Sequence, residues 1–250
     1  MKKISFMLSV VCVLSWLSAL PAQAEVQYNP NKTAKLLLAV KEGRDADAIN
    51  YIKQKDVDVN ARYEGVPVLI TAADKGRLAV VKALLNRSDI DVNKKAEGSG
   101  QTALYYASSD GHVAIVKELL KKPGIDVNNR ASLGETALWM ATHNNHVEVV
   151  KALLAHPDID VNIPDDSEDH VTPLMEAARK GYVEIAKALL NHKGIKLDAR
   201  CFYGHTALYY AQITHNDEIA DLIQLRQKST VQEFTQHLKK YVDHKLKQQS

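Results

Sequence analysis

The sequence predicts an all-α fold, a solenoid of about six helix-turn-helix repeats, from a duplicated segment, a constant spacing and two further motifs in phase. The segment GQTALYYA at 100–107 returns as GHTALYYA at 204–211. Related segments recur every 33 to 36 residues, and their aligned positions are Ala34, Pro67, Thr102, Thr136, Thr172 and Thr206. This period is typical of stacked repeats, so a duplicated catalytic loop is not needed to explain the two octapeptides.

Two other motifs keep the same phase. An apolar stretch appears as VVKALL at 80–85, IVKELL at 115–120, VVKALL at 149–154 and IAKALL at 185–190. Asp-Val-Asn follows at 58–60, 91–93, 126–128 and 160–162, and degenerates to Lys-Leu-Asp at 196–198. Three motifs in phase are far more specific than one.

Each repeat is predicted to contain a tight turn, a short first helix, a second turn and a second helix. Leu104, Ala107 and Ser108 fall on one face of the first helix, and Val116, Leu119 and Leu120 fall on one face of the second. The aligned threonines can cap the first helices, and Pro173 suits a first helical turn.

Glycines mark the predicted turns. Gly111 and Gly181 can end first helices in the left-handed conformation. Glycine also stands two residues before the aligned position at 65, 100, 134 and 204, which fits a tight hairpin-like turn.

The ends of the stack are predicted to differ from its middle. The first copy is irregular, and its second helix carries the charged residues Asp45, Asp47, Lys53 and Lys55, as expected of a terminal cap. The last copy runs into a charged segment at 226–250, whose apolar residues Val231, Phe234, Leu238, Tyr241 and Val242 have helical spacing. We expect a C-terminal capping helix there, with partner binding or weak attachment to an anionic membrane surface as alternatives.

The pattern G-x-T-A-L, followed by G-H, an apolar helix and D-V-N, resembles the ankyrin repeat family over about residues 33–225. Only Thr172-Pro173-Leu174 keeps the family's full T-P-L, and the family's histidine is replaced by Tyr105, Trp139, Met175 and Tyr209. The resemblance implies an ankyrin-repeat domain at 25–225 with hairpin-like turns. It also implies a concave face, lined by turn tips and first helices, that binds another protein.

The N-terminus predicts export. Lys2 and Lys3 precede an apolar run at 4–20, and Ala22-Gln23-Ala24 ends it in the manner of a secretory signal peptide at 1–24. Cleavage would leave Glu25 first and place the protein in the periplasm, with secretion as the alternative. An uncleaved membrane anchor fits less well, because the run is short and contains serines.

Charge and cysteine content restrict the function further. Loss of residues 1–24 removes two lysines and no acidic residue, so the net charge falls from +2 to 0. A neutral body argues against nucleic acid as the partner. Cys201 would be the only remaining cysteine, which rules out an internal disulfide and leaves the fold to be held by packing.

The sequence indicates no catalytic residue, metal or cofactor. His143 and His146 have ligand-like spacing, but His146 aligns with His112 at the start of a second helix, and no further ligand is in register. His156 and His192 align with Arg87 and Lys122 near the end of the second helix, where a cation complements the helix dipole. Metalloprotease, nucleophile-elbow and phosphate-loop motifs are all missing from the sequence.

Under the resemblance, the residues expected to contact a partner are the variable ones at the turn tips and along the first helices. These are Tyr63, Glu64, Asp74, Lys75, Gln101, Tyr106, Asp110, Leu133, Glu135, Met140, His143, Asn144, Glu176, Arg179, Lys180, Tyr203, His205 and Tyr210. The fifth tip carries four acidic residues, Asp165, Asp166, Glu168 and Asp169. We expect a solvated loop there, with an acidic knob for a basic partner as the alternative.

We therefore expect a non-enzymatic module that binds another protein in the periplasm and is monomeric alone. One alternative is an immunity-type protein that neutralises a toxin delivered to that compartment. Hypotheses from other classes are an enzyme that uses the groove as its active site and a self-associating structural protein.

Overall fold

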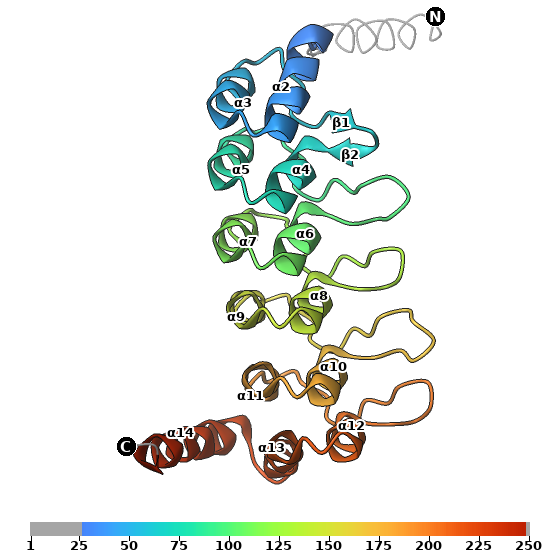
Figure 1. Cartoon of the computed structure of the whole chain (residues 1–250), viewed down its shortest axis with the longest axis vertical. Coiled ribbons are helices and arrows are strands. Elements are labelled where there is room, and N and C mark those ends of the chain that lie inside the picture. Colours follow the sequence, from blue (N-terminus) through green and yellow to red (C-terminus); the bar gives the residue numbers. More distant parts are fainter. Residues whose placement is uncertain (1–26, 249–250) are drawn as a thin grey trace, which may run out of the picture.

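The computed structural model describes residues 27–248 and confirms the predicted stack of helix pairs (Figure 1). The first helices of the six repeats are α2 (Pro30–Glu42), α4 (Val68–Asp74), α6 (Ala103–Ser109), α8 (Ala137–His143), α10 (Pro173–Lys180) and α12 (Ala207–Ile213). The second helices are α3 (Asp45–Ile52), α5 (Leu78–Leu85), α7 (Val113–Leu120), α9 (Val147–Leu154), α11 (Val183–Leu190) and α13 (Asp217–Gln227). A final helix, α14 (Val231–Gln248), follows the last pair. The predicted signal peptide lies outside the described residues.

A long turn projects from the stack between successive helix pairs, on the side of the first helices (Figure 1). In the first of these turns, β1 (Arg62–Tyr63) and β2 (Val66–Pro67) form an antiparallel pair, with Arg62 opposite Pro67 and Tyr63 opposite Val66. The predicted hairpin-like turns are therefore present, although only this one contains regular strands within the described residues.

One continuous apolar core runs along the stack. Leu104, Leu138 and Leu174 of successive first helices are buried, as are Val116, Val150 and Leu153 of the second helices. Each pair is covered by the pairs on either side, which is how repeats too small for separate cores gain stability. Of the two predicted helix faces, only Leu120 is less than fully buried.

The predicted helix caps are confirmed. Thr102, Thr136, Thr172 and Thr206 each precede a first helix in extended conformation and accept a hydrogen bond from the backbone N–H three residues later. Pro173 is the first residue of α10. The repeat at Pro67, which lacks the threonine, has no side-chain cap on α4.

The left-handed residue after the first helix makes room for the next repeat. Gly111 has φ of 74°, and a Cβ there would lie 2.7 Å from the His146 ring. His146 Nε2 is 2.9 Å from the carbonyl oxygen of Ser109, and His112 Nε2 is 3.0 Å from that of Asp74. Both histidines thus tie a second helix to the preceding first helix, which confirms the structural role that the alignment predicted.

The Asp-Val-Asn motif forms a second link between repeats. The Asn128 side chain donates to the carbonyl of Asp158 at 2.7 Å and accepts from the N–H of Asp160 at 2.9 Å. Each of the asparagines at 60, 93 and 162 makes the same two hydrogen bonds to the repeat that follows it. The aspartate of each motif accepts from the N–H of its own asparagine, and the valine is buried, so all three residues have a structural use.

Cationic side chains near the ends of the second helices are predicted to complement the helix dipole and its free carbonyl groups. This prediction is confirmed for Arg87 and Lys122 and is wrong for His156 and His192. Arg87 donates to the carbonyls of Ile52 and Gln54, and Lys122 donates to that of Leu85, so each closes the second helix of the preceding repeat. His156 and His192 are too short for this. Their Nδ1 atoms accept from backbone N–H groups two residues later, and burial lowers the pKa of His192.

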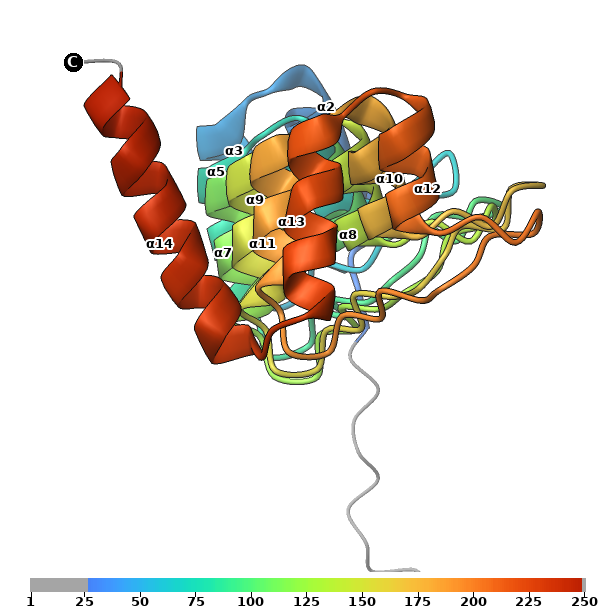
Figure 2. The ribbon, with the colours of Figure 1, turned by 90° about the horizontal axis from the view of Figure 1, so that it is seen from below.

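Helix α14 closes only part of the last repeat. It begins with a capping box, in which Thr230 N–H donates to Glu233 and Glu233 N–H donates to Thr230 Oγ1. Phe234 is fully buried against the stack. Seen from below, α14 lies beside the second helices and leaves α12 uncovered (Figure 2). The predicted capping helix therefore covers the second-helix side alone.

Burial of Leu153 between repeats yields a stability prediction. Leu153→Ala is expected to lower the free energy of unfolding by about 2–5 kcal/mol, because it leaves a cavity in the shared core. Glu135→Ala, at a turn tip, is expected to change it by no more than about 0.5 kcal/mol. Urea denaturation followed by circular dichroism measures both. Equal effects of the two variants would contradict the assignment of Leu153 to the core.

The asparagine link yields a second prediction. Asn128→Ala is expected to cost about 1–3 kcal/mol, because two hydrogen bonds to the next repeat are lost. Asn50→Ala is the matched control, because Asn50 is exposed on α3 and should tolerate the change. If the two variants unfold at the same denaturant concentration, the bridging asparagines do not stabilise the stack.

Candidate partner-binding surface

The turn tips form one connected edge, which we call the tip surface: residues 63–66, 97–101, 131–135, 165–170 and 201–205. Backbone hydrogen bonds join each tip to the next. The N–H groups of Glu97, Ser132, Asp166 and Phe202 donate to the carbonyls of Gly65, Ser99, Leu133 and Asp169, at 3.1, 2.8, 2.7 and 2.9 Å. A surface ordered in this way loses little conformational entropy when a partner binds.

The last tip and the neighbouring face of α12 carry an aromatic cluster, which consists of the exposed Phe202, Tyr203 and Tyr209 and the half-buried His205. Phe202 is 72% exposed and Tyr203 is 59% exposed, and their rings meet edge to face at 5.5 Å. His205 stacks on Tyr209 with 3.8 Å between the ring centroids. Exposed aromatic rings held by one another are typical of interface anchors.

A hollow of about 340 Å³ lies at the other end of the concave face. Its floor is apolar, with Leu37, Val66, Val68 and Ile70, and its rim is polar. Five residues predicted to contact a partner line it: Tyr63, Glu64, Asp74, Lys75 and Tyr106. An apolar floor inside a charged rim fits a single apolar side chain of a protein partner.

Lys41, which is part of α2, also lines this hollow. Its Nζ donates to the Tyr63 hydroxyl at 2.9 Å and lies 4.1 Å from the centre of the Tyr63 ring, and the hydrogen bond raises the pKa of Lys41. Sequence reasoning missed Lys41. It could have been found from the register, because Lys41 in the first copy aligns with Asp74, Ser109, His143 and Arg179 in the next four.

The middle of the concave face holds a line of four side chains. Trp139 stacks on His143 at 5.0 Å. His143 Nδ1 is 2.8 Å from Glu176 Oε1, and Arg179 donates to Glu176 Oε2 at 2.6 and 2.9 Å. Both carboxylate oxygens of Glu176 are therefore occupied. The Trp139 indole N–H donates to the carbonyl of Val171 at 2.9 Å, so the His143 and Arg179 side chains are the ones left to face a partner.

Within residues 27–248, no group of three or more histidine, cysteine, aspartate or glutamate side chains is placed to hold a metal ion. Among the helices of the same residues, none combines the length and apolar character needed to cross a bilayer.

Comparison with known proteins identifies the fold family. A family model described as ankyrin repeats (3 copies) matches residues 69–165 and 162–232. The chain belongs to the ankyrin repeat family.

Solved ankyrin structures resemble the chain closely in fold. The ankyrin repeat protein EF0377 superposes with a TM-score of 0.70 at 26% sequence identity, over 77% of this chain and 97% of that one. An ankyrin repeat domain (ABAYE2397) from Acinetobacter baumannii AYE superposes with a TM-score of 0.69 at 26% identity, with the same coverage. A search of curated proteins gives no match. Ankyrin stacks are in general protein–protein interaction scaffolds, and this chain shares that general property.

Two of the residues predicted from the ankyrin pattern are buried. Glu176 is enclosed by His143 and Arg179, and Tyr210 donates its hydroxyl to Cys201 Sγ at 3.5 Å. Burial raises the pKa of Tyr210. Both side chains support the first helices from within, and neither lies on the surface that a partner would touch.

The other predicted residues lie on the ankyrin concave face or at its tips, and several have local partners. Tyr106 donates to Gln101 at 2.7 Å, and Asn144 donates to the carbonyl of Ser109 at 2.8 Å. Leu133 is 67% exposed, whereas Met140 and Glu135 are half-buried. Asp110 and Lys180 are exposed at the ends of their helices.

The acidic tip differs from the expected solvated loop at one residue. Asp165 is buried and accepts from the N–H of Val171 at 2.7 Å, so it fixes the shape of the turn. Asp166 pairs with Arg130, while Glu168 and Asp169 are exposed. Only these last two acidic side chains are thus available without breaking a contact.

The two tyrosines of the last ankyrin repeat give a third prediction. Tyr210→Ala is expected to lower the free energy of unfolding by about 3–5 kcal/mol, because it empties a buried site. Tyr209→Ala is expected to cost about 0.5–1.5 kcal/mol, the size of one aromatic contact. Thermal and urea unfolding measure both. A stability loss for Tyr209→Ala as large as that for Tyr210→Ala would show that Tyr209 is part of the core.

Proposed function

We propose that this ankyrin-repeat protein is a non-enzymatic binding module that holds another protein in the periplasm. The partner would dock on the concave face and the tip surface, with the aromatic cluster as its main anchor. One observation carries the proposal: Phe202 and Tyr203 expose most of their rings at the end of a hydrogen-bonded edge. Leaving two large aromatic rings in water forgoes the free energy of their burial, which contact with a partner would recover.

The two ends of the concave face suit different parts of a partner. The aromatic cluster offers a flat apolar contact, whereas the hollow beside Tyr63 and Tyr106 offers an enclosed one with a charged rim. His143 and Arg179 lie between them and can donate hydrogen bonds or stack, whereas the indole N–H of Trp139 already donates to Val171. A partner that spans the face would thus be held by an anchor at each end, with polar contacts between them.

The compartment is proposed from the sequence of residues 1–24. A basic start, an apolar run and an Ala-x-Ala ending support export and cleavage. A stack without disulfides is compatible with that destination, because it is held by apolar packing and by hydrogen bonds between repeats.

The proposal is tested with the mature protein, residues 25–250, immobilised and exposed to periplasmic extract. The captured partner is then titrated against purified protein by calorimetry. The double variant Phe202→Ala/Tyr203→Ala is expected to weaken binding by about tenfold or more, as loss of interface anchors does. The native protein recovered from the same extract is expected to begin at Glu25.

The matched control is Tyr28→Ala, which removes an exposed aromatic side chain at the opposite end of the stack, beside Asp89 and outside both the hollow and the tip surface. It is expected to bind as the unmodified protein does. If the double variant and the control both bind with unchanged affinity, the aromatic cluster is not the anchor. A partner that is absent from the periplasm would refute the compartment.

A further inference from the structure

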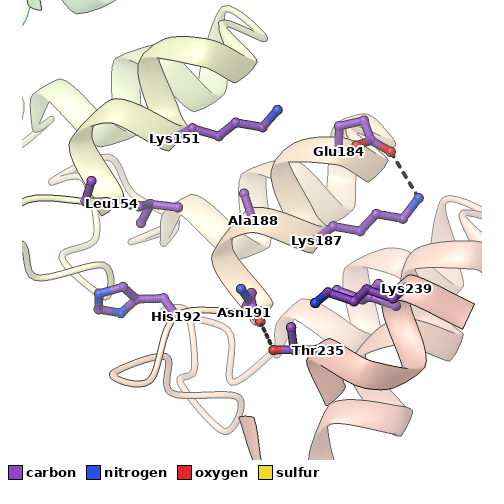
Figure 3. A pocket seen from close by; sticks show the side chains of 11 residues that line it. Lys151, Leu154, Glu184, Lys187, Ala188, Asn191, His192, Thr235 and Lys239 are labelled. Carbon is purple, nitrogen blue, oxygen red and sulfur yellow. Dashed lines mark hydrogen bonds and ion pairs between the residues drawn. The ribbon is translucent and has the colours of Figure 1, made fainter. Parts of the chain in front are cut away.

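A second elongated surface lies on the opposite side of the molecule, along the second helices. We call it the outer groove. Its C-terminal part is a hollow of about 760 Å³ between α9, α11 and α14 (Figure 3). A further hollow of about 640 Å³ lies over α5, α7 and α9. Ala155 lines both, so the two hollows adjoin.

The floor of the outer groove is apolar. Leu154, Ala155, Ala188 and Leu238 line the first hollow, and alanine and leucine side chains recur in the second. The small alanines would let the backbone of a docked segment come close. Helix α14 forms one wall, held there by Phe234 and by a hydrogen bond of 2.5 Å from Thr235 to Asn191 (Figure 3).

The rim of the outer groove is basic. Six lysines line the two hollows, against the two glutamates Glu118 and Glu184: Lys82, Lys117, Lys121, Lys151, Lys187 and Lys239. Several of these lysines already have partners. Lys151 pairs with Glu148, Lys121 with Glu118, and Lys187 with Glu184 and Glu218. The pairs of Lys121 and Lys151 are exposed and therefore weak, so carboxylates of a partner can replace them at little cost. Lys187 is mostly buried and keeps its two glutamates, so it contributes to the rim less than the other lysines.

The spacing of four of these lysines is close to the spacing of residues on one face of an α-helix. Lys82, Lys117, Lys151 and Lys187 occupy the same position in successive second helices, so neighbours are about 8–10 Å apart, the usual distance between packed helices. Residues seven apart on an α-helix lie on one face at about 10.5 Å. A helix with carboxylates at intervals of seven residues thus matches the lysines one by one. A single anionic headgroup would meet only one or two of them.

We infer that the outer groove is a docking site for an acidic amphipathic helix of a second protein. The apolar stripe of that helix would lie over Ala155, Ala188 and Leu238, and its carboxylates would pair with the lysines of the rim. This site is separate from the tip surface, since α14 and the tips lie on opposite sides of the stack (Figure 2). One molecule could then hold two partners at once.

The test uses full-length mature protein and a fluorescein-labelled model helix of about 21 residues. The helix carries a leucine stripe and glutamates at seven-residue intervals. Fluorescence anisotropy is expected to show saturable binding that weakens as salt is added. A peptide of the same composition with its glutamates and leucines permuted is expected to bind about tenfold more weakly.

The triple variant Lys117→Gln/Lys151→Gln/Lys239→Gln is expected to weaken binding by about tenfold, since each exposed charge pair contributes about two- to threefold. Lys35→Gln/Lys55→Gln/Lys95→Gln removes the same charge at exposed positions that line neither the outer groove nor the concave hollow, and is expected to bind unchanged. Ala155→Glu places an acidic group where the two hollows meet and is expected to abolish binding. Because Ala155 is exposed, the fold should tolerate this change, which a thermal melt checks.

Three results would overturn the inference. They are equal binding of the permuted peptide, equal losses in the two triple variants, and binding only to phosphatidylglycerol vesicles, which would mark a membrane-facing surface. None of them bears on the Phe202→Ala/Tyr203→Ala test, so failure here is distinguishable from failure of the proposed function.

Discussion

The need of each helix pair to cover its apolar face with the next pair governs this structure. A first helix here is seven or eight residues long after the first repeat, too short to be stable alone. Stacking buries residues such as Leu104 and Leu153 completely. It also brings polar groups of neighbouring repeats within hydrogen-bonding distance. His146 reaches back to Ser109 and Asn128 reaches forward to Asp158 and Asp160, so the stack is held by directional bonds as well as by burial.

Because the core extends along one line, two long surfaces of the stack are not used to pack one repeat against the next. On one side, the backbone bonds between tips turn separate loops into a single edge, so that Leu133 and Phe202 stand at fixed positions relative to one another. On the other side, the second helices present the same lysine position at each step. The first surface varies strongly from repeat to repeat, and the second repeats with little change. A variable surface suits recognition of one particular shape, whereas a periodic one suits a periodic ligand such as a helix.

The periodic features could be predicted from sequence, and the failures occurred where contacts depend on side-chain size across repeats. The capping threonines, the left-handed glycines and the buried leucines follow from local rules that act in every copy. Glu176 and Tyr210 occupy variable positions, and only the three-dimensional arrangement shows that neighbours enclose them. His156 and His192 align with Arg87 and Lys122 but cannot reach the same carbonyls. Asp165 belongs to an acidic run for which the sequence predicts a solvated loop, but its side chain accepts a hydrogen bond from the Val171 N–H and so fixes the shape of the turn. Alignment gives the position of a residue, and the length of its side chain decides what that residue contacts.

The duplicated octapeptide demonstrates how much depends on place in the stack. Tyr105 and Tyr209 are equivalent residues of nearly identical segments, but Tyr105 is 6% exposed and Tyr209 is 39% exposed. Trp139, at the same position, donates its indole N–H to Val171 in the following repeat, which shows where such a side chain points when a neighbour is present. Tyr209 has no following repeat, and α14 turns away to the second-helix side. An aromatic residue that is core in the third repeat therefore becomes surface in the sixth. The final repeat gains its exposed aromatic cluster largely because the stack ends there.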